Sequence, residues 1–320
     1  MTIAPREYDF EAARRRLEAK PKSAGPKLGA LEEAAALVKD GDHVALGGCL
    51  YSRTPLALVW ALLRRRPRHL TLSRNLMCYE GEWGMVAGAV DKLVTSWMGI
   101  GLPWGLSRIQ REFVEAGRVE FEEWSHLGLG LRYRAAAMGV PFLPSLTMLG
   151  SGLMDVGGSK TVACPYTGQT LHAVPALFPD VALIHVQKAD RLGNCQIDGY
   201  PHMDADIARA ASTVLVTAEQ IVSEDEIRLQ GDRTLIPGFM VDALAHVPYG
   251  SYPHECYGAY DAEPEHFTSY VDGILARGSA AVAEYLERYV YAPAAHADYL
   301  ALFGDGRRAD AASRARMLTT

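Results

Sequence analysis

The strongest constraint on the fold is the repeated order of a short apolar strand, a glycine turn and a helix along the chain. Residues 43–46 form an apolar strand that ends at Gly47 and Gly48, and a helix is predicted to follow over residues 55–63. Residues 181–186 form a second continuous apolar strand. Strands that are apolar on both faces are typical of parallel sheets, which helices cover on both sides. The pattern predicts an α/β fold, a single domain with a mainly parallel central sheet flanked by helices.

The domain boundaries follow from where this pattern starts and stops. Residues 1–27 are interpreted as an N-terminal arm, in which Pro21 and Pro26 break a short charged helix. Residues 28–305 form the predicted domain, and residues 306–320 are interpreted as a C-terminal tail. The sequence contains neither an internal repeat nor a low-complexity segment, so we expect one folded domain.

The composition excludes several classes of function. The chain has 320 residues, 49% of them hydrophobic and 22% charged, which is the balance of a globular protein with a buried core. A net charge of −6 argues against a nucleic-acid binder, and no apolar run is long enough to span a membrane. The start of the chain lacks the apolar core of a signal peptide. The five cysteines are spread singly without a CxxC pair, so we expect reduced thiols, a cytoplasmic location and no metal site.

The sequence also lacks the common nucleotide-binding, metalloprotease and serine-hydrolase motifs. No G-x-G-x-x-G follows a strand, and no P-loop, H-E-x-x-H or G-x-S-x-G occurs. The most informative segment is residues 40–55, in which a helix stop, a buried strand, a glycine pair and a polar turn precede Pro55. Glycine lets a ligand approach the backbone closely, and the start of the next helix favours negative charge. By itself the pattern also fits an ordinary strand-to-helix turn.

Residues 40–55 resemble the first signature of family I CoA transferases. That signature runs acidic-Gly, two residues, three apolar residues, Gly-Gly-aromatic, and then a proline after the second glycine. The matching residues are Asp40, Gly41, Val44, Ala45, Leu46, Gly47, Gly48 and Pro55. Cys49 stands where the family has an aromatic residue, and Arg53 stands where it commonly has glycine. The glutaconate CoA-transferase branch also carries a basic residue at this last position.

The resemblance to the alpha subunit of that branch extends from residue 28 to residue 305. Further segments match its motifs in the same order, and they are residues 135–144 (AAAMGVPFLP), 150–155 (GSGLMD), 204–208 (DADIA) and 248–260 (PYGSYPHECYGAY). Because these motifs are independent, their shared order carries more weight than any one of them. On these motifs the chain is identified as a member of the family, similar to its alpha subunits.

The resemblance implies the chemistry of a heteromeric CoA transferase. In this family a glutamate attacks the acyl-CoA thioester, and an anhydride and a glutamyl-CoA thioester then pass CoA to the acceptor acid. In the glutaconate type that glutamate lies on the beta subunit in a Ser-Glu-Asn-Gly-like motif, which this sequence lacks. The resemblance thus implies a beta-subunit partner in a heterodimer or heterotetramer, with coenzyme A and acyl-CoA as substrates and no permanently bound cofactor. Neither nucleic acid nor a membrane is expected as a partner.

The resemblance also suggests which residues of this chain line the shared site. Gly47 and Gly48 are expected to form a wall that acyl or CoA atoms approach. Ser52 and Arg53 are candidates for binding a carboxylate or the CoA, since an arginine holds a carboxylate through two hydrogen bonds. Ser151, in a Gly-Ser-Gly turn, is a candidate hydrogen-bond donor to the substrate. The alternatives are a surface ion pair for Arg53 and an ordinary turn serine for Ser151.

His126 is the candidate catalytic residue, at the predicted start of the helix that follows Ser125. A related two-subunit enzyme, a hydrolase that opens a carbocyclic ring in steroid breakdown, carries a catalytic glutamate in this segment of its alpha chain. Here His126 stands at that position, with Glu122 and Glu123 upstream. The histidine is interpreted as a general base, a substrate-binding group or an interface residue. The alternative functions are one half of a ring-opening or thioester hydrolase and a non-catalytic protein that binds acyl-CoA.

Overall fold

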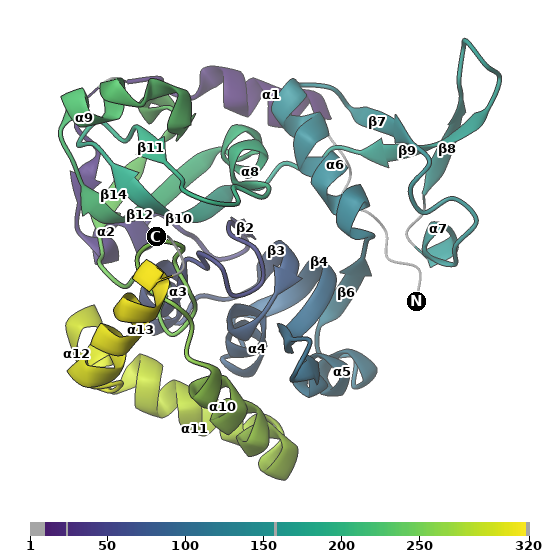
Figure 1. Ribbon diagram of the computed structural model, residues 1–320. Helices are drawn as coiled ribbons and strands as arrows, with labels where there is room; N and C mark the ends of the chain where they lie inside the picture. Colours follow the sequence, from purple (N-terminus) through teal and green to yellow (C-terminus); the bar gives the residue numbers. More distant parts are fainter. Residues whose placement is uncertain (1–9, 24, 157–158, 318–320) are drawn as a thin grey trace.

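The structure, a computed structural model, describes residues 10–23, 25–156 and 159–317. Residues 1–9 of the predicted arm and residues 318–320 of the predicted tail lie outside these ranges. The described residues fold around one large twisted sheet, with helices on both sides and a small sheet at one edge (Figure 1). Within these ranges, no helix has both the length and the apolar character that crossing a bilayer requires.

A mostly parallel sheet runs through the centre of the molecule (Figure 1). Its main strands are β1 (Leu28–Gly29), β2 (His43–Leu46), β3 (Leu70–Met77), β4 (Val90–Gly101), β6 (Glu120–Glu123), β10 (Val181–Ala189), β12 (Thr213–Ile221) and β14 (Ala243–His246). They lie in the order β1-β14-β12-β10-β2-β3-β4, with β6 beside β4, and each neighbouring pair is parallel. The short strands that add antiparallel pairs are β5 (Gly105–Leu106), β11 (Cys195–Gln196) and β13 (Thr234–Ile236). The predicted α/β fold with a mainly parallel sheet is confirmed.

The order in which the chain adds strands to the sheet reverses at β2. After β2 it adds β3, β4 and β6 on one side, and it then returns to add β10, β12 and β14 on the other side. The carboxyl ends of β2 and β10 are therefore neighbours. In open α/β sheets, ligands bind at the carboxyl ends of the strands where such a reversal occurs. The topology thus places the glycine turn after β2 at the expected ligand position.

Helices cover both faces of the sheet, so its strands are apolar on both sides. Val44 and Leu46 pack into one core and Ala45 packs into the other, because successive residues of a strand point to opposite faces. The helices of the first core are α2 (Leu31–Ala35), α3 (Leu56–Arg64), α4 (Tyr79–Val86), α5 (Arg108–Glu115), α10 (Pro264–Arg277), α11 (Ser279–Leu286), α12 (His296–Ala301) and α13 (Asp305–Met317). The helices of the second core are α6 (His126–Met138) and α8 (Asp204–Ala210).

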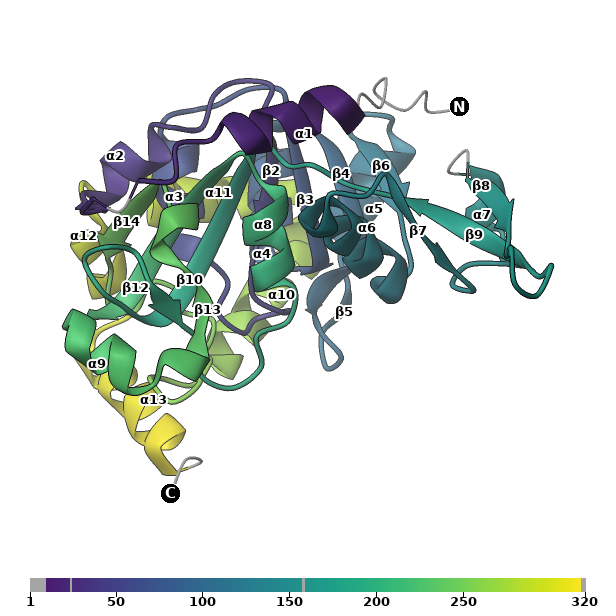
Figure 2. The same ribbon diagram turned by 90° about the horizontal axis from the view of Figure 1, so that it is seen from above.

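A small antiparallel sheet stands out from one side of the domain (Figures 1 and 2). Its strands lie in the order β7-β9-β8. Their bounds are β7 (Phe142–Ser145), β8 (Lys160–Ala163) and β9 (Thr170–Pro175), and the short helix α7 (Leu153–Val156) lies in the same segment. This part of the sequence is rich in glycine and proline, which favour turns and short hairpin strands over long elements.

The helices at the two ends of the described chain contact the body of the domain. After α1 (Phe10–Ala19), Lys20 Nζ lies 2.6 Å from Asp242 Oδ2. On α13, Arg314 Nε lies 3.3 Å from Asp261 Oδ2. These ion pairs connect both terminal helices to loops of the sheet and of the first core.

Helix α4 is an element that the sequence patterns do not predict. No sequence pattern predicts a helix over residues 79–86, yet α4 occupies them. This helix is buried around most of its circumference and contains two glycines, so it lacks the one-sided apolar stripe of a surface helix. Strand β14 begins at Ala243, because the preceding residues Gly238–Met240 form a 3₁₀ turn.

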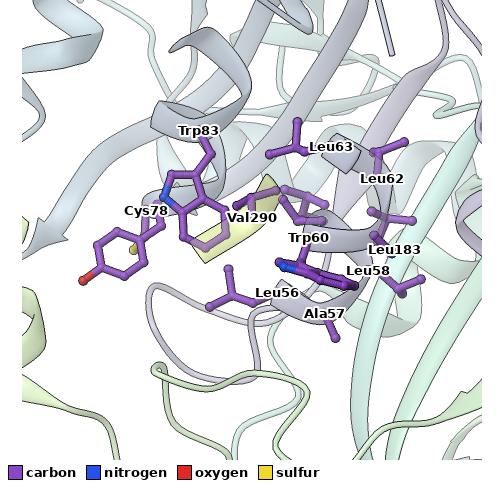
Figure 3. Packing of buried hydrophobic residues seen from close by; sticks show 14 of the residues in the cluster. Leu56, Ala57, Leu58, Trp60, Leu62, Leu63, Cys78, Trp83, Leu183 and Val290 are labelled. Carbon is purple, nitrogen blue, oxygen red and sulfur yellow. The ribbon is translucent and has the colours of Figure 1, made fainter. Parts of the chain in front are cut away.

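Helix α3 forms the centre of the first core (Figure 3). Every residue from Leu56 to Leu63 is buried, so the helix has no face toward solvent over this length. Leu183 of β10, Trp83 of α4 and Val290 lie around it in the same cluster (Figure 3). The helix that follows the glycine turn is thus anchored by apolar contacts on all sides, which keeps the turn itself in place.

Replacing Leu183 by alanine should lower the free energy of unfolding by about 2–5 kcal/mol, because it removes buried methyl groups and leaves a cavity. Leu183 is 1% exposed in this core. The matched control is Leu229→Ala, at a leucine that is 85% exposed. That change should alter the free energy by about 0.5 kcal/mol or less. Urea denaturation followed by tryptophan fluorescence measures both, and equal effects would contradict the packing of this core.

Candidate active site

The glycine turn after β2 is shaped by contacts within this chain. The Gly47 N–H donates to the Leu183 carbonyl of β10 at 2.9 Å. Gly48 has a φ of +71°, in the left-handed region that favours glycine. A Cβ atom on Gly48 would lie 2.3 Å from the Ser52 carbonyl oxygen. Glycine at position 48 is therefore required by the turn itself.

The carboxylate of Asp204, at the start of α8, holds this turn from one side. Asp204 is fully buried, and its Oδ1 accepts the Gly48 N–H at 2.7 Å. Its Oδ2 forms an ion pair with Arg53. A Cβ atom on Gly47 would lie 2.8 Å from the same Oδ1, so glycine at position 47 leaves room for the carboxylate. The expected wall of Gly47 and Gly48 is thus built against an acidic side chain of this chain.

Arg53 lies inside the protein, where it is 1% exposed. Besides its ion pair with Asp204, its guanidinium donates to the Tyr200 carbonyl at 2.7 Å and to the His185 carbonyl at 3.2 Å. Its φ is +52°, a left-handed conformation that glycine adopts more easily, which accounts for the glycine common at this position of the family signature. Arg53 therefore does not form the surface ion pair that was the alternative for it. In the structure it binds the buried carboxylate of Asp204.

A second buried ion pair holds the turn from another direction. Arg74 of β3 and Glu80 of α4 are both fully buried, and Nη1 lies 2.6 Å from Oε1. Arg74 Nε donates to the Gly47 carbonyl at 3.0 Å, and Nη2 donates to Thr54 Oγ1 at 3.1 Å. Arg74 and Asp204 are supports of the site that the sequence motifs do not predict. An arginine within a buried strand is the signal that the sequence offers, because a buried charge requires a partner.

The two candidate serines lie on different loops. Ser52 is half-buried in the glycine turn, where its N–H donates to the Cys49 carbonyl at 2.7 Å and its backbone pairs with that of Glu255. Burial raises the pKa of this Glu255 carboxyl. Ser151 is exposed, and its Oγ donates to the Met148 carbonyl at 2.7 Å, as an ordinary turn serine does. The structure therefore places Ser52 at the glycine turn and Ser151 on a loop that contacts the start of α6.

His126 is the first residue of α6, and the preceding Ser125 caps the helix by accepting the Gly128 N–H at 3.0 Å. The Nε2 of His126 lies 3.1 Å from the Nε2 of His202. The Nδ1 of His202 lies 3.0 Å from the Gly48 carbonyl oxygen. Burial lowers the pKa of both rings, that of His202 to about 4, so both are mainly neutral at pH 7. His202, which the sequence analysis missed, thus connects His126 to the glycine turn.

Glu122, upstream of His126, is engaged in ion pairs. Its carboxylate lies 2.8 Å from Lys92 Nζ, pairs with Arg132 and accepts the Trp124 Nε1–H at 2.8 Å. Burial alone raises the pKa of this carboxyl, but the charges of Arg132 and Lys92 outweigh burial and lower the pKa to about 2. Glu122 therefore stays ionised near neutral pH and is poorly suited to accept a proton there.

One buried group contains side chains of the types that bind metal ions, namely His185, Glu219 and Cys256. The Nε2 of His185 lies 2.7 Å from Glu219 Oε1, and the Tyr260 hydroxyl donates to the same oxygen at 2.6 Å. The Tyr249 N–H donates to Glu219 Oε2 at 2.8 Å. Both carboxylate oxygens thus already accept hydrogen bonds, which is the environment of a structural buried carboxylate.

Asp204→Ala should destabilise the protein by about 3–5 kcal/mol, because it leaves the Arg53 guanidinium buried without its counter-ion. The matched control is Asp225→Ala, at a carboxylate whose side chain is 89% exposed and pairs with Arg228. Removing this surface charge should change the stability by about 0.5 kcal/mol or less. Urea denaturation compares the two variants. If the loss at Asp204 were no larger than the loss at Asp225, Asp204 would not be the support described here.

Comparison with known proteins reveals relatives over most of the chain. The profile of the coenzyme A transferase family matches residues 29–246. An uncharacterized protein of Archaeoglobus fulgidus is 36% identical over 292 residues, which cover 91% of this chain and 65% of that relative. The chain therefore spans less than two thirds of the length of that relative. The alpha-type subunit of glutaconate CoA-transferase from Acidaminococcus fermentans is 36% identical over 255 residues, which cover 73% of this chain and 79% of that relative.

Solved structures share the fold. The crystal structure of glutaconate coenzyme A-transferase from Acidaminococcus fermentans has a TM-score of 0.85 at 32% identity, over 89% of this chain and 95% of that chain. The decarboxylase AibA/AibB has a TM-score of 0.73 at 31% identity, over 82% of this chain and 98% of that chain. These findings confirm the resemblance identified in the sequence motifs. The chain belongs to the coenzyme A transferase family, in which it is similar to the alpha subunits of the glutaconate type.

Proposed function

We propose that this chain is the alpha subunit of a heteromeric coenzyme A transferase, which moves CoA between an acyl-CoA and a carboxylic acid. The observation that carries the proposal is the glycine turn at the carboxyl end of β2, which Asp204 and Arg74 hold where the sheet reverses its order. A rigid turn at this position supports a binding surface for a thioester substrate. The similarity to the alpha-type subunit of a glutaconate CoA-transferase supports the transfer reaction.

In this proposal the covalent glutamate belongs to a separate beta subunit. To reach the thioester carbonyl a carboxylate nucleophile must be accessible, so a carboxylate in a buried ion pair is unsuited to the role. Asp204 and Glu80, which support the turn, are both in such pairs. Glu255 is partly exposed beside Ser52, but it lacks the Ser-Glu-Asn-Gly-like context of the family nucleophile. The beta subunit therefore completes the site in a heterodimer or heterotetramer.

The candidate residues take distinct roles in the proposed site. Gly47 and Gly48 form the wall that the thioester approaches, and Arg53 holds this wall from behind. Ser52 offers its hydroxyl group to the acyl or CoA moiety, whereas Ser151, whose proton goes to the Met148 carbonyl, can only accept a hydrogen bond from it. Coenzyme A and acyl-CoA are substrates, and no permanently bound cofactor is required. All cysteines of the chain are unpaired, which supports a reducing compartment such as the cytoplasm.

A coenzyme A thioester hydrolase is the second candidate, and His126 is the observation that favours it. A neutral imidazole at this place is suited to take a proton from an attacking water, whereas the upstream Glu122 is held in ion pairs. In the transferase the same imidazole accepts a hydrogen bond from a donor group of the substrate. The third candidate function is that of a non-catalytic protein that binds acyl-CoA.

The chain purified alone should transfer no CoA, and addition of the beta subunit should restore transfer. Borohydride reduction of the complex after incubation with acyl-CoA, followed by mass spectrometry, identifies the residue that carries the glutamyl thioester. We expect the modification on the beta subunit. Modification of Glu255, or transfer by the isolated chain, would contradict this division of labour. Hydrolysis without transfer would favour the hydrolase, and acyl-CoA binding without turnover would favour a non-catalytic role.

His126→Ala should lower turnover about 10²–10⁴-fold if the imidazole is a general base, and clearly less if it only makes a hydrogen bond. Because burial lowers the pKa of His126 below 6.5, the wild-type rate should rise with pH in the acidic range as the ring loses its proton. The variant should lose this rise of the rate with pH. The matched control is His69→Ala, at a histidine that is 73% exposed and pairs with Asp91. Wild-type kinetics in His126→Ala, with the complex intact, would exclude His126 from the reaction.

A further inference from the structure

His202 links the glycine turn to His126 through both of its ring nitrogens. Its Nδ1 lies 3.0 Å from the Gly48 carbonyl oxygen, and its Nε2 lies 3.1 Å from the Nε2 of His126. The two imidazole rings are arranged edge to face, with centroids 5.1 Å apart. His126 starts α6 and His202 lies on the loop before α8, so the tertiary fold brings them together.

The Gly48 carbonyl determines where the protons of both rings lie. A carbonyl oxygen only accepts hydrogen bonds, so the Nδ1 of His202 carries a proton and donates it. A neutral His202 then has a lone pair at Nε2, and His126 must donate its own Nε2–H to that lone pair. The Nδ1 of a neutral His126 is consequently an unprotonated acceptor.

The backbone and the charges around His202 favour this arrangement. His202 has a φ of +49°, a conformation that a non-glycine residue keeps only where its surroundings hold it. The Tyr200 ring packs against it with centroids 5.4 Å apart. Burial lowers the pKa of His202 to about 4, Asp204 acts against this shift, and His126 and Arg74 add to it. The His202 ring therefore stays neutral well below pH 6.

We propose that His202 is a positioning residue that fixes His126 in the tautomer with a protonated Nε2 and a free Nδ1. The inference rests on the proposed function and deepens it, because the turn that bounds the thioester site then also decides which nitrogen meets the substrate. In the transferase the free Nδ1 faces the substrate as a hydrogen-bond acceptor. In the hydrolase alternative Nδ1 takes a proton from water, whose O–H bond breaks while the oxygen forms a bond to the thioester carbonyl carbon. The resulting imidazolium continues to donate its Nε2–H to His202, which itself gains no proton.

Two substitutions of His202 separate this positioning role from simple packing. Glutamine places its amide oxygen near the position of Nε2 and keeps an acceptor for His126. Asparagine places its amide N–H near the position of Nδ1 and keeps only the donor to Gly48. In the complex with the beta subunit, His202→Gln should retain turnover within about 3-fold, whereas His202→Asn should lose about 10-fold or more, the effect of a lost hydrogen bond to a charged group. Melting temperature and complex assembly report whether both variants remain folded.

The pH profile and the tautomer are readouts that packing alone would leave unchanged. Loss of the acceptor destabilises the His126 imidazolium and lowers its pKa, so the acidic limb should move to lower pH in His202→Asn and stay in place in His202→Gln. Nitrogen NMR of the complex, with isotope-labelled histidines, should show a protonated Nε2 and an unprotonated Nδ1 for wild-type His126. This preference should weaken in His202→Asn.

Several results would overturn the positioning role. They are equal losses of turnover in the two variants, wild-type turnover in both, or an unchanged His126 tautomer in His202→Asn. The double variant His126→Ala/His202→Asn should lose no more turnover than His126→Ala, and a further loss would assign His202 a different role. If His126→Ala alone leaves turnover unchanged, the proposed role of His126 fails, while the nitrogen spectra still decide whether His202 sets its tautomer.

Discussion

The carboxylate of Asp204 is shared between the Gly48 N–H and the Arg53 guanidinium, and the geometry of the site depends on this buried contact. Both charges are removed from water, so the loss of either one leaves the other buried without compensation. The contact joins the start of α8 to the turn after β2. It thereby helps to hold the turn whose Gly48 carbonyl oxygen lies 3.0 Å from His202 Nδ1. The left-handed backbone of Arg53 is a strained conformation that this ion pair offsets.

The buried pair of Arg74 and Glu80 holds the same turn through the Gly47 carbonyl. With carboxylates and arginines on both sides, the turn has little freedom to move. Such rigidity suits a site where charge develops on a thioester, because prearranged dipoles need not reorganise during the reaction. It also explains the glycine pair, since a Cβ atom at position 47 would displace the Asp204 carboxylate and one at position 48 would collide with the turn. In the proposed complex, this chain would provide such a rigid half of the active site.

The parallel sheet was predictable because its signal is local. The strands at residues 43–46 and 181–186 are apolar throughout, and such strands require cover on both faces. Helix α6 was predictable from its capping serine, Ser125, whose side chain accepts the Gly128 N–H. Helix α4 was not, because Gly81 and Gly84 lower its helix propensity and Cys78 before it offers no capping side chain. The order of the strands was not predictable either, since it depends on which apolar faces pack together.

The sequence by itself determined the family, the class of fold, the glycine turn and the histidine at the start of α6, because each depends on a few residues that are neighbours in the chain. The tertiary structure alone decided that Arg53 binds Asp204, that Arg74 supports Gly47 and that His202 meets His126. Arg53 and Asp204 are 151 residues apart in the chain. No local sequence pattern encodes contacts between residues so far apart in the chain. These contacts form because the strand order reverses at β2 and because α6 contacts α8 over one face of the sheet.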